Sequence, residues 1–152
     1  MNNQQPYQQP YQQPMVPQAP IRQLKTNRGL VKFIVLSIIT FGIYALVVMY
    51  SLSEDLNDIS SRYDGKKTMN FLLIAFIFAP LTFGIAAIVW FHKFSARVGN
   101  ELQRRNINFS FGASSYWGWS VLGSLIIVGP FVYYYKLFKS MNLLSESFNM
   151  NG

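Results

Sequence analysis

The sequence contains no cysteine and a single histidine, and only 12% of its 152 residues are charged. Without cysteine the chain has no disulfide framework and no thiolate site for a metal, and one imidazole cannot build a histidine-rich metal site within one chain. A soluble globular domain carries about 25% charged residues. The low charge therefore indicates a chain that faces lipid over much of its surface.

The sequence also lacks the patterns that carry catalysis. It has neither a glycine-rich phosphate loop nor a nucleophile elbow, and no pair of groups is poised for acid–base work. His92 ends an apolar run beside Trp90, where a position at a membrane surface is favoured over a ligand role. Glu54, Asp55 and Asp58 are better explained as helix surface than as a cation site. We predict no enzyme activity, and no catalytic, cofactor-binding or metal-binding residues.

The charge that is present is mostly basic, with a net charge of +7. The lysines and arginines lie just outside the apolar runs, as anionic headgroups and membrane topology both favour. We therefore expect a lipid bilayer as the partner and no nucleic acid.

Three apolar runs without charged residues dominate the chain, at residues 33–50, 69–91 and 116–135. As a helix, the middle run is about 34 Å long, and a hydrocarbon core is about 30 Å thick. The runs predict an all-α integral membrane protein with about three transmembrane helices, placed in the cell membrane as a multi-pass protein. The distribution of lysine and arginine predicts a cytoplasmic N-terminus and a C-terminus on the other side.

Aromatic residues mark the ends of these runs. Rings with one polar atom prefer the headgroup level of a bilayer. This preference predicts five interfacial anchors: Trp90, Trp117, Trp119, Tyr133 and Tyr134.

An internal repeat underlies the three runs. The string Thr-Phe-Gly-Ile occurs at residues 40–43 and again at 82–85, and Gly129 takes the equivalent place in the third run. A serine follows each of these glycines at the same distance, and apolar residues at spacings of three and four then predict an amphipathic helix. The chain is thus expected to form a membrane domain at 24–149 from repeats at about 24–65, 66–110 and 111–149, with a short tail at 150–152.

Each apolar run is broken near its middle by Gly42, Gly84 or Gly129, with Pro80 and Pro130 close to two of the breaks. The simpler interpretation is a kinked helix that still crosses the bilayer. The alternative is a re-entrant hairpin that returns to its starting side, because about eleven residues before a break reach only about 16 Å. Helix breaking and close helix packing are the two roles that we predict for these five residues.

The first 23 residues differ in composition from the rest. They contain five prolines, repeated Gln-Gln-Pro-Tyr units and few large aliphatic residues. Such a segment has too little to bury to offset the entropy of ordering, so we predict a disordered tail.

Seven short strings stand out along the chain, at residues 28–30, 40–44, 53–57, 62–69, 90–93, 99–102 and 122–124. In this ordered combination the chain resembles the small bacterial membrane proteins of domain-of-unknown-function family 4234. The resemblance spans roughly residues 24–149. It implies a membrane protein and no particular activity.

The sequence favours a structural, regulatory or adaptor component of a membrane complex. An oligomeric channel or transporter subunit is the alternative, although the apolar runs contain no ionisable group of the kind that transport pathways use. Small residues spaced four apart leave two kinds of packing open: within one chain, or in a homo-oligomer or with a membrane protein partner.

Overall fold

The computed structural model describes residues 20–152, and the predicted disorder of residues 1–19 lies outside the described part. Residues 20–152 are helical or irregular, without a strand. In chain order the elements are α1 (Leu30–Ile39), α2 (Ile43–Asp64), α3 (Phe71–Leu73), the π-helix η1 (Ile74–Phe78), α4 (Ala79–Leu81), α5 (Ile85–Arg104), α6 (Ala113–Ser115), the π-helix η2 (Tyr116–Val121), the 3₁₀-helix η3 (Leu122–Leu125) and α7 (Gly129–Asn151).

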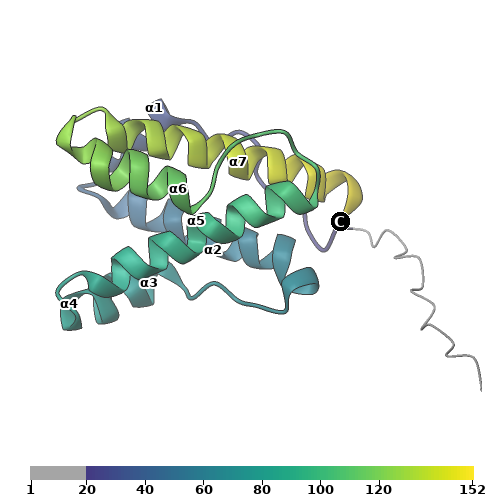
Figure 1. Cartoon of the computed structure of the whole chain (residues 1–152), viewed down its shortest axis with the longest axis horizontal. Coiled ribbons are helices and arrows are strands. Elements are labelled where there is room, and N and C mark those ends of the chain that lie inside the picture. The colour runs from purple at the N-terminus through teal and green to yellow at the C-terminus, as the bar shows by residue number, and fades with distance from the viewer. Residues whose placement is uncertain (1–19) are drawn as a thin grey trace, which may run out of the picture.

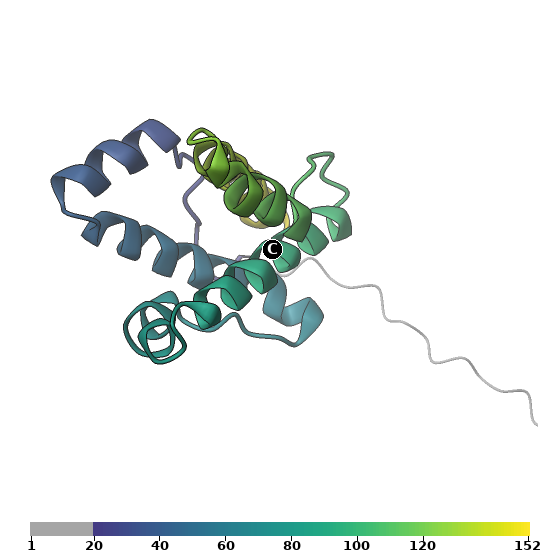
Figure 2. The ribbon, with the colours of Figure 1, turned by 60° about the vertical axis from the view of Figure 1, so that its left-hand side comes forward.

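These elements form three helical hairpins, each with a short arm and a long arm. The short arms are α1, then α3 with η1 and α4, then α6 with η2 and η3; the long arms are α2, α5 and α7. Figure 1 shows the three reversals of the chain at one end of the molecule, the tip end. The long arms end at the opposite end, the polar end, and the open V of the first hairpin is clear in Figure 2.

The prediction of transmembrane helices is wrong for the described residues. Among residues 20–152 there is no helix that combines the length and the apolar character needed to cross a bilayer. The physical reason is the break inside each apolar run, which ends α1 after ten residues and gives the long arms a polar second half. Each run turns back on itself, as the hairpin alternative proposed.

The predicted placement of the two chain ends on opposite sides of a membrane is also wrong for the described residues. The backbone N–H of Leu24 donates to Asn149 Oδ1 at 2.7 Å, and the Asn149 side chain donates back to the Leu24 carbonyl at 2.8 Å. The beginning and the end of the described chain therefore lie at the same end of the molecule.

The core lies where the three long arms cross. The apolar stripes predicted for the amphipathic helices are buried there, with Leu52, Leu56 and Ile59 from α2, Phe94, Val98 and Leu102 from α5, and Leu137, Met141, Leu144 and Phe148 from α7. The serines that follow the three repeat glycines, Ser53, Ser95 and Ser140, are fully buried among them. Small side chains at these positions let the helix backbones approach closely.

Gly99 lies at another close contact, between α5 and the loop that leads to the third hairpin. A Cβ atom there would lie 2.5 Å from the carbonyl oxygen of Phe111, which is backbone and cannot move aside alone. We expect Gly99→Ala to lower the free energy of unfolding by about 1–3 kcal/mol, the usual cost of overpacking. Denaturant unfolding in mild detergent, followed by circular dichroism, measures this.

Gly118→Ala is the matched control, because Gly118 is helical and a Cβ there meets no atom within 4 Å. Equal losses of stability in the two variants would contradict the steric explanation for Gly99.

Candidate functional site

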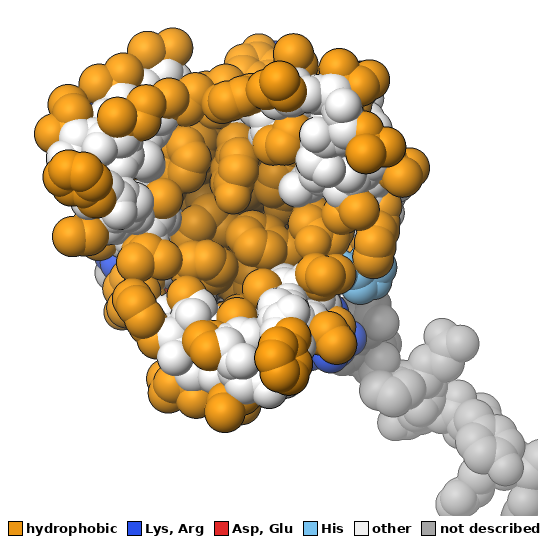
Figure 3. Space-filling view, turned by 90° about the vertical axis from the view of Figure 1, so that its left-hand side faces the viewer, with side chains coloured by type: hydrophobic (Ala, Val, Ile, Leu, Met, Phe, Trp, Pro, Cys, Tyr) orange, Lys and Arg blue, Asp and Glu red, His pale blue; other side chains and the backbone are white. Residues whose placement is uncertain are grey.

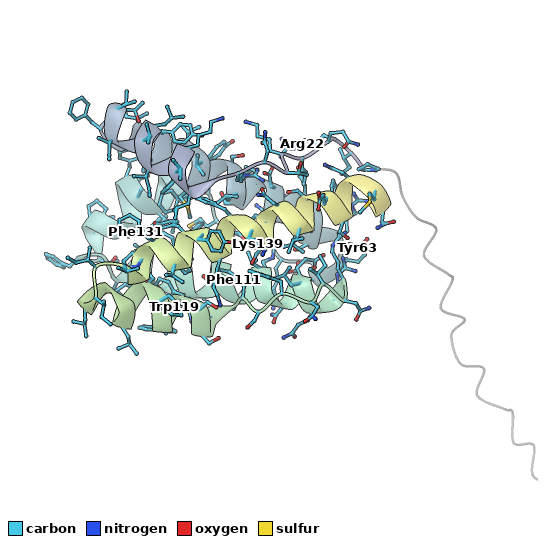
Figure 4. The ribbon with its side chains drawn as sticks, turned by 90° about the horizontal axis from the view of Figure 1, so that it is seen from above. Arg22, Tyr63, Phe111, Trp119, Phe131 and Lys139 are labelled. Carbon is cyan, nitrogen blue, oxygen red and sulfur yellow. The ribbon has the colours of Figure 1, made fainter. Side chains whose placement is uncertain are left out.

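The tip end exposes a dense set of large apolar side chains. Phe41 and Phe83, at the first two tips, are each 98% exposed, and Leu125 and Ile127 at the third are 86% and 81% exposed. Figure 3 looks onto this end and shows a hollowed apolar face, with basic side chains only at its edge and no acidic ones. In Figure 4, Phe131 and Trp119 mark this end, and Arg22 and Tyr63 mark the opposite one. Monomeric soluble proteins rarely expose an apolar surface of this extent.

The first two tips share one backbone design. Phe41 and Phe83 have φ of 50° and 51°, and the following Gly42 and Gly84 have φ of 89° and 87°. Two successive left-handed residues reverse the chain, and the second position favours glycine because it carries no Cβ. The Gly42 N–H reaches the Ser37 carbonyl at 2.7 Å, and Gly84 makes the matching bond at 2.8 Å.

The threonine of each Thr-Phe-Gly-Ile string joins the two arms of its hairpin. Thr82 Oγ1 donates to the Phe78 carbonyl at 2.7 Å and accepts the Ala86 N–H at 2.9 Å. Thr40 makes the same two bonds, to Leu36 and from Tyr44, at the same distances. With the backbone bonds of the turn, every N–H from Thr82 to Ile88 has an acceptor. The reversal therefore needs no water to satisfy its amides.

The third tip is built differently. Gly129 is the first residue of α7 and does not have the positive φ of Gly42 and Gly84. It instead packs on Gly123: a Cβ on Gly129 would lie 2.3 Å from the Gly123 carbonyl group. Its equivalence to Gly42 and Gly84 thus extends to position but not to conformation.

The two prolines lie inside short stretches where a missing N–H is tolerated. Pro130 occupies the first turn of α7, and Pro80 lies in α4 directly after the π-helix η1. Both flank a reversal of the chain.

The predicted interfacial anchors divide into two groups. Trp117 and Trp119 are each 43% exposed, but Trp90 and Tyr133 are only 5% and 1% exposed. Trp90 Nε1 donates to the Met69 carbonyl at 2.7 Å, and the Tyr133 hydroxyl lies 2.9 Å from Ser95 Oγ. Trp90 and Tyr133 are thus core residues and not surface anchors, because the protein itself supplies the polar partner that a headgroup would supply.

Tyr134, Trp117 and His92, which were also predicted to lie at a membrane surface, contact other side chains of the protein. Tyr134 is partly buried against Phe33, with ring centroids 5.1 Å apart. Trp117 Nε1 donates to Nδ1 of His92 at 3.0 Å. His92 therefore sits at the surface in contact with an aromatic ring, and residues 20–152 contain no cluster of three or more potential metal ligands.

The polar end is held by ion pairs that cross between segments. Asp55 is 4% exposed and binds both Arg28 and Arg22, the latter at 3.0 Å, while Arg22 also reaches Asp58 at 2.7 Å. Burial raises the pKa of the Asp55 carboxyl and lowers that of the Arg28 guanidinium, despite their mutual attraction. Arg22 belongs to the predicted disordered tail, yet it is bound to α2.

Arg97 on α5 connects the second hairpin to the end of the first. Its guanidinium binds Asp64 at 2.7 and 3.1 Å and also donates to Asn57 and Thr68 at 2.7 Å each. Although desolvation alone would raise the pKa of Asp64, the hydrogen bonds and charge of Arg97, together with the Lys66 backbone and charge, hold it below its ordinary value.

Asparagine side chains clamp the extended segments that lead into the hairpins. Asn57 both accepts the Thr68 N–H at 2.7 Å and donates to the Thr68 carbonyl at 3.0 Å, which fixes the segment before the second hairpin. Asn142 on α7 holds Arg28 in the same two-point manner, at 3.1 and 2.9 Å, before the first hairpin. The third hairpin therefore closes back on the first.

The family model described as a domain of unknown function, DUF4234, matches residues 28–100. These residues are a DUF4234 domain. The match confirms the family resemblance and covers the first hairpin and most of the second, a shorter range than the resemblance predicted. No curated protein and no solved structure matches the chain.

Sequence reasoning missed the roles of the two DUF4234 threonines and of the clamping asparagines. The repeated string drew attention to its glycines, but the threonine hydroxyl is what connects the arms. The signal was available, since both copies of the string begin with threonine. Asn57 and Asn142 follow the repeat glycines Gly42 and Gly129 at similar offsets, which fits polar helix surface equally well. The offsets do not reveal their partners, which lie 11 and 114 residues away.

The hydroxyl of Thr82 can be tested with an isosteric replacement. In Thr82→Val the Ala86 N–H loses its acceptor, and we expect the free energy of unfolding to fall by about 1 kcal/mol. Amide hydrogen exchange at residues 84–88 should accelerate in parallel. Thr82→Ser keeps the hydroxyl and should behave like the native chain; if it exchanges as fast as Thr82→Val, the hydroxyl is not the cause.

The ion pair of Asp64 predicts a pH dependence. Because its folded pKa is lower than the unfolded value of about 3.9, the carboxylate stabilises the fold above that value, and the effect disappears as the pH falls through the folded pKa. Asp64→Asn should cost about 0.5–1 kcal/mol of unfolding free energy near neutral pH, and this cost should shrink as the pH falls through the folded pKa. The exposed Glu146→Gln is the control, with no cost expected across the same pH range.

Proposed function

We propose that this protein docks on one leaflet of a membrane through its tip end and serves there as a structural or adaptor component. The observation that carries the proposal is the apolar tip end, where Phe41 and Phe83 are almost completely exposed. No helix crosses the bilayer in this arrangement; the three hairpins enter the leaflet and return.

The dimensions of the short arms support insertion into one leaflet. Helix α1 has ten residues and is about 15 Å long, which matches half of a hydrocarbon core of about 30 Å. The tips would therefore reach close to the bilayer midplane.

The positions of three lysines support the same depth of insertion into the leaflet. Lys32, Lys93 and Lys136 lie on the first, second and third hairpin, each roughly 11–13 Å from its tip along the helix axis. Lysine side chains at this level can extend to lipid phosphates while their stems cover apolar surface. The ion-paired polar end would then remain in water.

The satisfied turns remove the main cost of placing a reversal in hydrocarbon. An unpaired backbone N–H in a lipid environment costs several kcal/mol, so irregular backbone is normally excluded there. The Thr82 hydroxyl and the left-handed Phe-Gly pair leave no such group between Thr82 and Ile88. Such a turn suits a medium without water.

The adaptor role follows from what remains exposed after docking. The polar end holds both ends of the described chain and presents them to the aqueous side. We propose the cytoplasmic leaflet, since its anionic lipids attract a chain of net charge +7. A partner protein or a second copy would bind there. The channel or transporter alternative gains no specific support from the described contacts.

Acidic substitutions at the first two tips test whether the tip end docks on the membrane. Phe41→Asp with Phe83→Asp places two carboxylates where hydrocarbon is expected, and vesicle binding should weaken by more than about 100-fold. Flotation with phosphatidylcholine vesicles measures the bound fraction, and circular dichroism checks that the variant is folded.

Ile21→Asp with Met150→Asp is the matched control. These two side chains are 74% and 72% exposed and lie at the other end of the molecule. Binding should be unchanged in this variant. Vesicle binding that survives charged tips, or that is lost equally in both double variants, would refute docking through the tip end.

A further inference from the structure

The second hairpin contains a groove between its two arms, which we call the second-hairpin groove. It has a volume of about 940 Å³ and is bounded by α5, by Ile74 and Phe78 of η1, by Thr82, and by side chains from residues 63–69. Ligand pockets commonly have volumes of about 300–1,000 Å³. The groove extends from the tip region toward the polar end.

One stripe of α5 forms the floor of this groove and changes character along its length. Near the tip the stripe is apolar, with Ile85, Ala86 and Val89; farther along it continues with Lys93 and Arg97. Spacings of three and four keep these side chains on one face of the helix. Phe78 from η1 adds to the apolar half and is 40% exposed.

The end of the groove farther from the tip, its basic half, is lined by more cationic than anionic side chains. Its lining contains five lysine and arginine side chains against two acidic ones. Arg97 pairs with Asp64, and Arg104 pairs with Glu101. Among residues 20–152, Lys66, Lys67 and Lys93 form no ion pair through their side chains, so their charge is available to an anionic ligand.

The internal repeat supplies a comparison within the same chain. A pocket in the first hairpin is lined in part by Tyr44, Val47 and Ser51, which stand 42 residues before Ala86, Val89 and Lys93. This pocket has a volume of about 110 Å³. The second hairpin thus has a small side chain where the first has a tyrosine, and a lysine where the first has a serine.

From this arrangement we propose that the second-hairpin groove binds one anionic phospholipid molecule. An acyl chain lies along Ile85 and Val89, and the phosphate lies among Lys66, Lys67 and Lys93. The apolar half begins at the tip, so a chain can enter from the leaflet. This site deepens the proposed docking function by naming the lipid that the docked protein retains.

The test uses Trp90, which lines the groove, as the only tryptophan in a Trp117→Phe and Trp119→Phe background. The probe is phosphatidylglycerol with brominated acyl chains, diluted into detergent micelles, and the reference is brominated phosphatidylcholine. Bromine quenches a nearby indole. We expect the anionic lipid to quench Trp90 at a concentration about tenfold lower than the zwitterionic lipid.

Two substitutions in the second hairpin introduce the residues that the first hairpin has at the equivalent positions. Ala86→Tyr fills the groove and should abolish quenching at low lipid concentration. Lys93→Ser should reduce the preference for the anionic lipid about fivefold. Their matched controls are Ile88→Tyr, at an exposed site that does not line the groove, and Lys32→Ser, in the first hairpin. Both controls should keep quenching and preference.

The proposal is overturned if Ala86→Tyr leaves quenching intact, or if Lys32→Ser lowers the preference as much as Lys93→Ser. Equal quenching by the two lipids would overturn it as well. The micelle measurement does not require a bilayer, so it is independent of vesicle flotation. Loss of docking with retained groove selectivity, or the reverse, therefore shows which of the two proposals has failed.

Discussion

The structure depends on reversing an apolar chain without leaving its backbone amides unpaired. The Thr-Phe-Gly-Ile string meets this constraint twice, with a left-handed Phe-Gly pair to turn the chain and a threonine hydroxyl to join the arms. Once the chain turns there, the two halves of each apolar run lie in neighbouring helices and not in one continuous span. The exposed tips, the short arms and the groove between the arms all follow from this reversal.

Contacts at and near the polar end join the three hairpins to one another. In addition to the apolar core that the long arms share, polar contacts hold each hairpin against the next. Asn57 holds the segment before the second hairpin, Gly99 allows the segment before the third to pack on α5, and Asn142 holds the segment before the first. The three hairpins thus form a closed ring, and the buried Asp55 with Arg28 and Arg22 strengthens its last junction.

The sequence predicted the local features well and the path of the chain poorly. The buried stripes of α2, α5 and α7 were readable from spacing, since a side chain every three or four residues faces one neighbour. The length of the middle apolar run suggested a membrane crossing, because length alone does not show where Gly84 adopts a left-handed conformation. Trp90 looked like an interfacial ring, but its N–H bonds to Met69, 21 residues away, a contact that no local pattern encodes.

Differences between the repeats indicate where function was added to the shared scaffold. A repeat that served packing alone would keep similar side chains at equivalent positions, as Ser53 and Ser95 do in the core. Between the arms, by contrast, the second hairpin has Ala86 and Lys93 where the first has a tyrosine and a serine, and its groove is several times larger than the pocket lined by that tyrosine and serine. An open, basic-edged groove stabilises nothing by itself, since it forfeits packing and brings like charges together. Its presence in one copy is best explained by an anionic, partly apolar ligand that completes it.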